Sequence, residues 1–437
     1  MKGRFWDAFD YILFICVIIL VATGIAFIYS SGIDADGILR TNEYIKQIIW
    51  TAIGLAFMIF FALYDYRKLE RPAQWIYAAS IILLIITFLF GKKVNGARSW
   101  LGIGDFGIQP SEFTKIVFIL ALAKYLDISI NENQIKRFII ALAIFIIPCG
   151  LILIQPDMGS ASVYIPIFLV MCFVSGIPVR FLLFIIGAGF ATIFFTILPV
   201  WNQYIVKNSF RLITSLTTFK LKLILITASA LIFFIALIVR KYFHGRRYFY
   251  WIAYTFSIIT IGLAMSSIAD KVLKAYQLQR LIIFMNPDID RLGAGWNIIQ
   301  SKIAIGSGGL FGRSFLHGTQ SHYRYLPQQS TDFIFSILSE EWGFLGGCFV
   351  FLIYLVLMLR TLIIVKNASN RFGMYISAGI LGMLMIHFFI NVGMVMGIMP
   401  ITGIPLLFLS YGGSSLLTAM TAIGLLMSIN SRKFDFI

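Results

Sequence analysis

The sequence predicts an all-α polytopic integral membrane protein with about twelve transmembrane helices. Charged residues make up only 12% of the 437 residues and hydrophobic residues 59%, whereas soluble domains carry about 25% charged residues. Apolar windows recur along the chain, and each is about twenty residues long, the length that crosses roughly 30 Å of hydrocarbon. Lysine and arginine gather in alternate connections between these windows, as expected of cytoplasmic loops.

The apolar windows give the expected spans in order. The first, Tyr11–Tyr29, is long enough to cross the membrane and lacks a small-residue cleavage site, so it is not a signal peptide. The four cysteines lie far apart in apolar runs without a CxxC pair, which predicts buried hydrophobes and neither disulfides nor a thiolate metal site. The expected spans are 11–30, 45–64, 74–91, 113–126, 138–155, 159–176, 181–201, 221–239, 250–268, 332–359, 372–397 and 406–429.

The distribution of positive charge orients these spans. With the N-terminus inside, every predicted inner segment contains lysine or arginine, so we expect both termini in the cytoplasm. Two outer segments are also basic, and with the net charge of +16 they indicate an anionic ligand at the outer face. The inner basic residues are Lys2, Arg4, Arg67, Lys68, Arg71, Lys136, Arg137, Arg180, Arg240, Lys241, Arg246, Arg247, Arg360, Lys366, Arg371, Arg432 and Lys433.

The longest polar interval, from Tyr276 to Gly347, falls mostly outside the membrane in this topology. It contains the neighbouring acids Asp288 and Asp290, followed by seven glycines between Gly293 and Gly318. Long loops between membrane helices often carry function, although a plain connecting loop is the alternative.

One stretch of this interval, GSGGLFGRS from Gly306 to Ser314, imitates a phosphate-binding loop. Ser307 occupies the first glycine position of that pattern and Arg313 replaces its lysine. We therefore expect no nucleotide cofactor.

Polar residues also interrupt the fourth window. Pro110 suits a first helical position, and Lys115 follows Glu112 on the same helix face. The pair is either a surface pair at a capped helix start or a cation held beside Arg98 for a phosphate. Trp100 suits the membrane interface.

Acidic residues near other windows allow two interpretations each. Asp157 either caps the next helix or acts in catalysis. Asp332 opens a long apolar helix, and Glu340 and Glu341 follow at a depth where each charge costs about 2.5–3.5 kcal/mol unless paired or wet. One of the two would face a polar cavity and the other a structural partner, unless the helix begins later and leaves both at the interface.

Nine motif-like segments follow one another in chain order. They are GARSW (Gly96–Trp100), QPSEFTK (Gln109–Lys115), QPDMGS (Gln155–Ser160), NPDIDRLGAGWNIIQS (Asn286–Ser301), IAIGSGGL (Ile303–Leu310), GTQ (Gly318–Gln320), TDFIF (Thr331–Phe335), EEWG (Glu340–Gly343) and PITGIPLLFLSYGGSS (Pro400–Ser415). Together they resemble the SEDS family (shape, elongation, division and sporulation), whose members are bacterial membrane glycan polymerases. The variants GSGGL and HGTQ resemble the elongation branch.

The resemblance implies one SEDS membrane domain over residues 1–437 with a ten-helix core. Residues 212–268 would then be a two-helix insertion, and 269–331 a large extracytoplasmic catalytic loop. The small residues of PITGIPLLFLSYGGSS favour close helix packing, with a ligand role second.

The resemblance also implies an activity. The chain would be a peptidoglycan glycosyltransferase of the bacterial cytoplasmic membrane that polymerises lipid II into β-1,4 glycan strands at the outer face during cell elongation. Its partners would be lipid II, the growing strand, membrane lipid, a class B penicillin-binding protein and other elongation-complex proteins, with no nucleic acid. The family's essential aspartate corresponds to Asp290.

The chemistry agrees with these residue types. Inversion at the anomeric carbon needs one base on the acceptor 4-hydroxyl, and we expect Asp290 in that role. A pyrophosphate leaving group needs positive charge or a divalent cation such as Mg²⁺ or Mn²⁺, whose ligands the sequence leaves unassigned. The expected substrate-binding residues are Lys115, Glu112, Arg98, Trp100, Asp157, Lys302, Arg280, Gln300, Ser301, Gln320, Asp332 and Glu340.

Three positions depart from the family pattern. Arg291 stands where proline is common, Ser330 where histidine is common and Gln328 where glutamate is common. A mechanism that needs that histidine or glutamate is not expected here. Two other functions stay open: a lipid II flippase, which needs a charged cavity but no outer carboxylate base, and a non-catalytic scaffold for the penicillin-binding protein.

Overall fold

The computed structural model describes residues 9–94, 97–103, 106–201, 219–242, 247–272, 280, 283–291 and 293–433. These residues form two compact units. The first unit comprises Met1–Ile177 together with Asn297–Ile437, and the second unit is Pro178–Trp296. Residues 212–218 and 243–246 of the predicted insertion, and 273–279, 281–282 and 292 of the predicted loop, lie outside the described residues.

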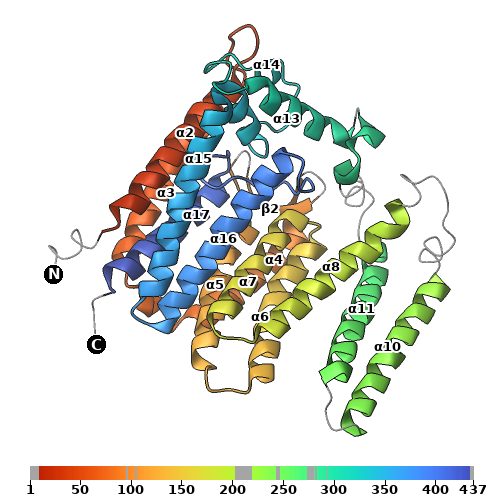
Figure 1. Ribbon diagram of the computed structural model, residues 1–437. Helices are drawn as coiled ribbons and strands as arrows, with labels where there is room; N and C mark the ends of the chain where they lie inside the picture. The colour runs from red at the N-terminus through yellow and green to blue at the C-terminus, as the bar shows by residue number, and fades with distance from the viewer. Residues whose placement is uncertain are drawn as a thin grey trace. The chain divides into compact units, whose positions relative to one another are not determined.

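The first unit is a helical bundle with a small sheet (Figure 1). Its central helices α16 and α17 are almost wholly buried, because the other helices surround them. Its elements are α2 (Tyr11–Gly32), α3 (Glu43–Leu63), η1 (Tyr66–Leu69), α4 (Ala73–Phe90), β1 (Lys92–Val94), β2 (Ala97–Ile103), β3 (Phe106–Ile108), α5 (Pro110–Ile128), α6 (Gln134–Ile154), α7 (Met158–Val174), α13 (Ala294–Gly308, from Asn297 on), α14 (Thr319–His322), α15 (Ile334–Asn367), α16 (Arg371–Val395) and α17 (Gly413–Ser431).

Among its described residues, the second unit has three long helices and a short turn. Helix α11 packs against both α8 and α10, and the Lys222 ammonium donates to the Ser266 hydroxyl at 2.8 Å between α10 and α11. A Cβ at Gly262 would lie 2.6 Å from that of Ala191, so glycine permits the close approach of α8 and α11. The elements are α8 (Val179–Trp201), α10 (Phe219–Tyr242), α11 (Arg247–Val272) and η4 (Pro287–Asp290).

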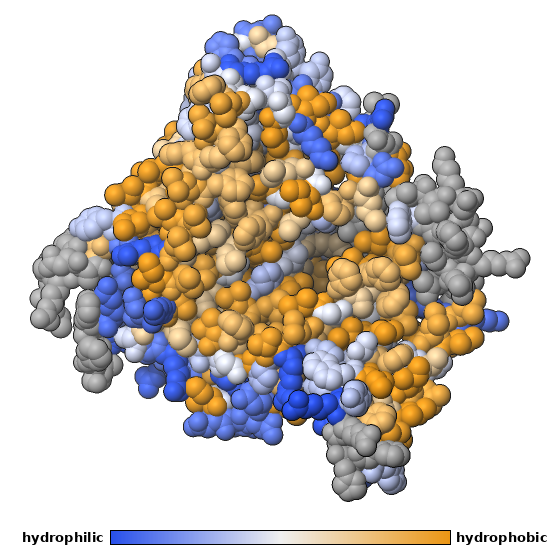
Figure 2. Space-filling view, viewed as in Figure 1, coloured by the Kyte–Doolittle hydropathy of each residue, from blue (hydrophilic) through white to orange (hydrophobic). Residues whose placement is uncertain are grey.

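Every predicted span coincides with a helix, which confirms an all-α polytopic membrane protein. Ten helices among the described residues are long and apolar enough to cross a membrane. The other two are α5, which carries four charged side chains in 19 residues, and α7, which has 17 residues. Figure 2 shows the corresponding surface on the first unit: hydrophobic side chains cover the middle of the face formed by α2 and α15, and hydrophilic side chains gather at its ends.

Four local expectations were wrong. The last span starts later than predicted, because residues 406–412 are not helical and α17 begins at Gly413. Asp332 precedes α15, which begins at Ile334. Cys348 is exposed on the apolar surface of α15, whereas the other three cysteines are buried. Residues 92–94, 97–103 and 106–108 add an antiparallel sheet in the order β1-β2-β3, for which the Asn-Gly dipeptide at 95–96 is a sequence signal.

Both ends of the described chain lie on the same side of the first unit (Figure 1). The buried Asp10 carboxylate accepts from the Arg360 guanidinium at 2.8 Å and from the Asn430 amide at 3.2 Å. Asp10 also caps α2 by accepting from the Leu13 N–H. The two ends of the described chain therefore lie together, and the placement of both termini in the cytoplasm stays a prediction.

The α16–α17 linker, residues 396–412, is irregular backbone, and its residues 401, 404 and 406–410 are buried among helices. A membrane interior offers no water for its polar groups, so side chains must satisfy them. The Asn391 amide donates to the Ile404 carbonyl at 2.8 Å, and the Tyr354 hydroxyl donates to the Leu407 carbonyl. Gln47 donates to the Ser410 carbonyl at 3.2 Å. These contacts from α3, α15 and α16 fix the linker's course.

Helix α15 is broken at Gly343, whose φ of 65° and ψ of −161° are not helical. The segment Gly309–Ser314 occupies the break with four backbone hydrogen bonds. The Phe344 N–H donates to the Gly309 carbonyl at 2.9 Å and the Leu345 N–H to the Leu310 carbonyl at 3.2 Å. In the other direction, the N–H groups of Arg313 and Ser314 donate to the carbonyls of Glu340 and Glu341 at 3.0 and 3.1 Å.

The Gly309–Ser314 segment gives a test of this docking. Gly312 has φ +81°, and a Cβ there would lie 2.7 Å from the Gly343 backbone nitrogen. We expect Gly312→Ala to lower the melting temperature of the purified protein by more than Gly309→Ala. Gly309 also has a positive φ, +57°, but an added Cβ there has no atom within 4 Å. Gly309→Ala therefore measures only the backbone strain, about 1–2 kcal/mol, without a steric clash. Equal losses for the two variants would contradict the docking.

Candidate functional site

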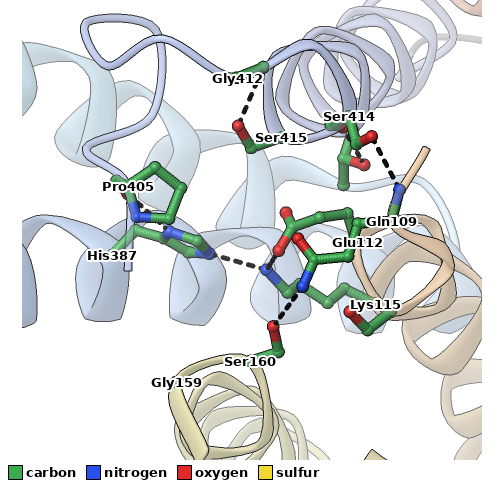
Figure 3. A network of polar contacts seen from close by, with 12 residues as sticks. Gln109, Glu112, Lys115, Gly159, Ser160, His387, Pro405, Gly412, Ser414 and Ser415 are labelled. Carbon is green, nitrogen blue, oxygen red and sulfur yellow. Dashed lines mark hydrogen bonds and ion pairs between the residues drawn. The ribbon is translucent and has the colours of Figure 1, made fainter. Parts of the chain in front are cut away.

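A cavity of about 50 Å³ lies in the first unit, where α5, α7 and the α16–α17 linker meet. Figure 3 shows the polar side chains around it. Apart from Val163, the lining residues from α5, α7 and their N-caps are polar, and the rest of the lining comes from the linker. The lining residues are Gln109, Glu112, Lys115, Asp157, Ser160, Val163, Gly403, Ile404 and Pro405.

The start of α5 supplies the charges. Pro110 occupies the first turn as expected, and Glu112 lies in that turn, where the positive end of the helix dipole stabilises a carboxylate. The Lys115 ammonium contacts Glu112 Oε1 at 2.6 Å, and the two side chains are 1% and 5% exposed. The interpretation as a surface pair was therefore wrong. The pair is buried, and Glu112 Oε2 has no partner among the described residues.

Lys115 has a second partner on α16. Its Nζ lies 3.2 Å from His387 Nε2, and His387 Nδ1 lies 3.0 Å from the Pro405 carbonyl oxygen. Figure 3 shows the imidazole between the linker and Lys115. The ammonium is thus held from two sides by α5 and α16.

On the other side of the cavity, the Asp157 carboxylate forms a hydrogen-bond network with neutral side chains at the starts of α5 and α7. Asp157 caps α7, as predicted, by accepting from the Ser160 N–H at 3.0 Å. Its second oxygen accepts from Gln109 Nε2 and from the Ser160 hydroxyl, both at 2.8 Å. The Gln109 N–H donates to the Ser414 hydroxyl at 3.0 Å, which ties α5 to α17. The capping residue therefore also presents its carboxylate to the cavity.

Asp332 approaches the same wall from the loop before α15. Its carboxylate lies against Gly403, where an added Cβ would be 3.4 Å away, and its backbone carbonyl accepts from Asn391 at 3.0 Å. Gly403 has φ +72°, a conformation that glycine adopts without strain. The structure thus brings Lys115, Glu112 and Asp157 together, with Asp332 beside them.

Glu340 and Glu341 both hold structural partners. Glu340 is fully buried and accepts from the Thr319 hydroxyl at 3.0 Å and the Gln320 N–H at 2.9 Å. Glu341, also fully buried, accepts from the Leu316 N–H at 3.1 Å and from the Ser30 hydroxyl. These two acids bind residues 316–320 over the break in α15. The expectation that one of them faces a polar cavity finds no support among the described residues.

Other predicted binding residues in this unit lie away from the cavity lining. Ser301 is buried, with its hydroxyl 2.8 Å from that of Ser336 and 2.6 Å from the Val395 carbonyl. Gln300 is buried, and Lys302 is exposed with its ammonium against Gly397. On β2, Arg98 is exposed and the Trp100 ring packs against Gly107.

Outside the predicted spans, an ion pair fixes the turn between α2 and α3. Arg40 Nε contacts the Asp34 carboxylate at 2.6 Å. The Arg40 hydrogen bond lowers the pKa of Asp34 below its ordinary value. The adjoining Ile33 carbonyl accepts from His322 Nδ1 at 2.9 Å, so this turn supports α14.

Asp290 and Arg280 belong to the second unit, and both side chains are half-buried. Asp290 ends the turn η4, and two glycines leave room for it. A Cβ at Gly293 would lie 2.5 Å from Asp290 Oδ1, and one at Gly295 would lie 2.6 Å from the Asp290 carbonyl oxygen. The glycines of the sequence RLGAG therefore permit the tight approach of the next segment to the proposed base.

Comparison with known proteins identifies the family. The FtsW, RodA and SpoVE family model, described as "Cell cycle protein", matches residues 10–220 and 207–434. The chain belongs to this family. The SEDS resemblance drawn from the nine segments is thereby confirmed.

Curated SEDS relatives match along nearly the whole chain. The peptidoglycan glycosyltransferase RodA of Treponema pallidum is 51% identical, covering 99% of this chain and 100% of its own length. The peptidoglycan glycosyltransferase MrdB of Escherichia coli K12 is 33% identical, covering 99% and 96%.

Solved structures show the same fold. The rod shape determining protein RodA of Thermus thermophilus gives a TM-score of 0.61 at 23% identity, covering 99% of both chains. A chain of a peptidoglycan synthase complex that coordinates polymerization and crosslinking gives 0.65 at 24% identity, covering 98% of this chain and 99% of its own.

The carboxylates suit a divalent cation only in part. No group of three or more His, Cys, Asp or Glu side chains suited to a metal occurs in the part of the chain that the structure describes. Two carboxylates, those of Glu112 and Asp157, line the cavity. Mg²⁺ commonly binds one or two protein carboxylates together with substrate phosphates, so this donor set is compatible with a cation that arrives with a pyrophosphate.

Sequence reasoning missed His387, and it gave the linker residues Gly403 and Pro405 a ligand role only as the second interpretation. His387 lies alone in an apolar run and outside the quoted motifs. The signal was its position, because an ionisable residue inside a membrane span is a functional candidate by default.

The buried Lys115–Glu112 pair gives a second test. We expect Lys115→Met and Glu112→Gln each to destabilise the protein by about 3–5 kcal/mol, because each leaves one buried group without its partner. The double variant should lose less than the sum, measured by unfolding of the purified protein. Lys136→Met is the matched control, since its 2.9 Å pair with Glu132 is exposed, and it should leave the melting temperature unchanged. Additive losses at Lys115 and Glu112 would contradict the pairing.

Proposed function

We propose that this protein is a peptidoglycan glycosyltransferase that polymerises lipid II into β-1,4 glycan strands. The observation that carries the proposal is the buried Lys115 ammonium at a cavity lined by carboxylates and linker backbone, in a chain that belongs to the SEDS family. The relatives named peptidoglycan glycosyltransferase match nearly every residue of this chain. This support favours an enzyme over a scaffold.

The proposed reaction is one displacement with inversion. The acceptor 4-hydroxyl oxygen attacks the anomeric carbon of the lipid-linked donor, and the carbon–oxygen bond to the pyrophosphate breaks. Asp290 takes the hydroxyl proton, and the bond electrons leave with the lipid pyrophosphate. The glycines that follow Asp290 support this role because they keep bulk away from its carboxylate.

Lys115 is the proposed partner of the leaving group. A buried ammonium stabilises the charge that develops on the departing pyrophosphate more strongly than an exposed one would. Glu112 holds the lysine in position through the 2.6 Å contact. A divalent cation, held by the Asp157 and Glu112 carboxylates and the pyrophosphate, would supply further positive charge at the same atoms.

The location and partners are also proposals. The basic inner segments favour the bacterial cytoplasmic membrane with both termini inside, which leaves residues 269–331 and Asp290 at the outer face. The structural likeness to a chain of a peptidoglycan synthase complex supports a crosslinking partner, proposed here as a class B penicillin-binding protein.

The role of Asp290 is tested with purified protein and fluorescent lipid II, alone and with its cognate transpeptidase. We expect Asp290→Asn to abolish glycan ladders, a loss of at least about 100-fold, because it removes the base. Asp288→Asn is the matched control from the same turn η4 and should keep ladder formation. A folded Asp290→Asn protein with wild-type ladders would contradict the proposal.

The same preparation distinguishes the flippase alternative. A wild-type protein that makes no polymer, yet moves lipid II across reconstituted vesicles, would replace the polymerase proposal. Wild-type ladders with no transport would exclude the flippase.

The divalent cation is tested by chelation. We expect EDTA to stop ladder formation and Mg²⁺ or Mn²⁺ to restore it, because the cavity carboxylates otherwise oppose the pyrophosphate charge. The melting temperature with EDTA serves as the control for folding. Full activity in EDTA would remove the cation from the mechanism.

A further inference from the structure

We infer that His387 is a positioning residue for Lys115, and that it works as a neutral imidazole with its proton on Nδ1. This inference rests on the proposed function, since it assigns the residue that aims the cation of the proposed pyrophosphate site. His387 belongs to none of the motifs that carry the family resemblance.

The hydrogen-bond partners decide the tautomer. A carbonyl oxygen only accepts, so the 3.0 Å contact with Pro405 requires a proton on Nδ1. A lysine ammonium only donates, so the 3.2 Å contact with Lys115 requires a lone pair on Nε2. One neutral tautomer meets both requirements. An imidazolium would instead place an N–H against the ammonium, with two positive charges side by side.

The same contacts decide the direction of the lysine. Its ammonium has three N–H groups. Among the described residues, Glu112 Oε1 accepts from one and His387 Nε2 from another. Lys115 also lines the cavity, so the third N–H is the one available to a ligand there. With only the Glu112 contact, the ammonium could rotate away; the imidazole fixes its second direction.

The imidazole also couples the lysine to the opposite wall. Pro405 lines the cavity, and its carbonyl is the acceptor for Nδ1. His387 is 1% exposed, so water does not compete for either nitrogen. A ligand that displaces Pro405 would therefore move the imidazole, and with it the direction of the ammonium.

The first measurement concerns the tautomer and does not depend on activity. The chain has four histidines, so ¹⁵N-histidine-labelled protein gives few imidazole signals, and the His387→Gln spectrum assigns the one of interest. We expect an Nδ1–H, bare Nε2 pattern at neutral pH, with the Nε2 signal shifted in Lys115→Met. A doubly protonated ring, an Nε2–H tautomer or an unshifted signal would overturn the inference.

The second measurement concerns turnover. We expect His387→Leu to lower kcat/KM for lipid II by about 10- to 100-fold, because it frees the ammonium to leave its direction. His387→Gln should restore most of the loss, because its amide can donate to Pro405 and accept from Lys115. Full activity in a folded His387→Leu protein, or no recovery with His387→Gln, would contradict a positioning role.

A comparator on the same helix separates positioning from support of the linker. Asn391 donates to Ile404, the residue next to Pro405, and to the Asp332 carbonyl, and among the described residues neither of these bonds involves Lys115. At equal loss of melting temperature, His387→Leu should lose more kcat/KM per folded molecule than Asn391→Leu. Equal losses would assign His387 to structural support only.

The failures remain distinguishable. If the wild type makes no polymer, the proposed function fails, and the histidine spectrum still tests the geometry. If the wild type polymerises lipid II but His387→Leu and His387→Gln have the same kcat/KM, the inference about His387 fails and the proposed function stands.

Discussion

Buried backbone N–H and C=O groups need hydrogen-bond partners, and the structure depends on this requirement most strongly at the α16–α17 linker. An interrupted helix inside a membrane protein leaves N–H and C=O groups that lipid cannot satisfy. Here side chains from three helices supply the partners: Gln47, Tyr354 and Asn391. The linker can therefore run beside α5 and α7 and expose Gly403 and Pro405 to a polar cavity. A continuous helix at these positions would have closed that wall.

The cavity's charges follow from the same constraint. A lysine in the bundle interior is expensive unless paired, and Lys115 is paired with Glu112 and His387. Each partner comes from a rigid helix, so the ammonium has a defined direction as well as a counter-charge. Buried pairs of this kind add little net stability. We propose that the Lys115–Glu112 pair serves instead to present one cation to a ligand.

The break in α15 shows the constraint at a second place. Its free backbone groups are satisfied by the Gly309–Ser314 segment, and the buried Glu340 and Glu341 bind the residues that follow. The glycine-rich stretch thus serves as a docking strand for a broken membrane helix. Its backbone N–H groups at Arg313 and Ser314, in the stretch that imitates a phosphate loop, donate to protein carbonyls.

The sequence was sufficient for the helices and for part of the site. Long apolar windows located every span. Polar residues are costly in or beside such windows, and this cost marked four positions of the site: Pro110, Glu112, Lys115 and Asp157. Local pattern could not reveal that Glu112 and Lys115 are buried, since that depends on α7, α16 and the linker packing around them. Residues 406–412 are apolar enough to suggest a helix, and only the distant Gln47 and Tyr354 explain why they are not one. His387 escaped notice because its partners are distant in sequence, on α5 and the linker.

The most direct test of this account is equilibrium binding of undecaprenyl pyrophosphate to the purified protein, measured by native mass spectrometry. The account predicts that Lys115→Met weakens binding by about tenfold or more, the worth of one charged hydrogen bond. Lys124→Met, at the other end of α5 with its ammonium on the Arg71 carbonyl, should bind like the wild type. Wild-type affinity in a folded Lys115→Met protein would contradict the central claim that this cavity receives the pyrophosphate.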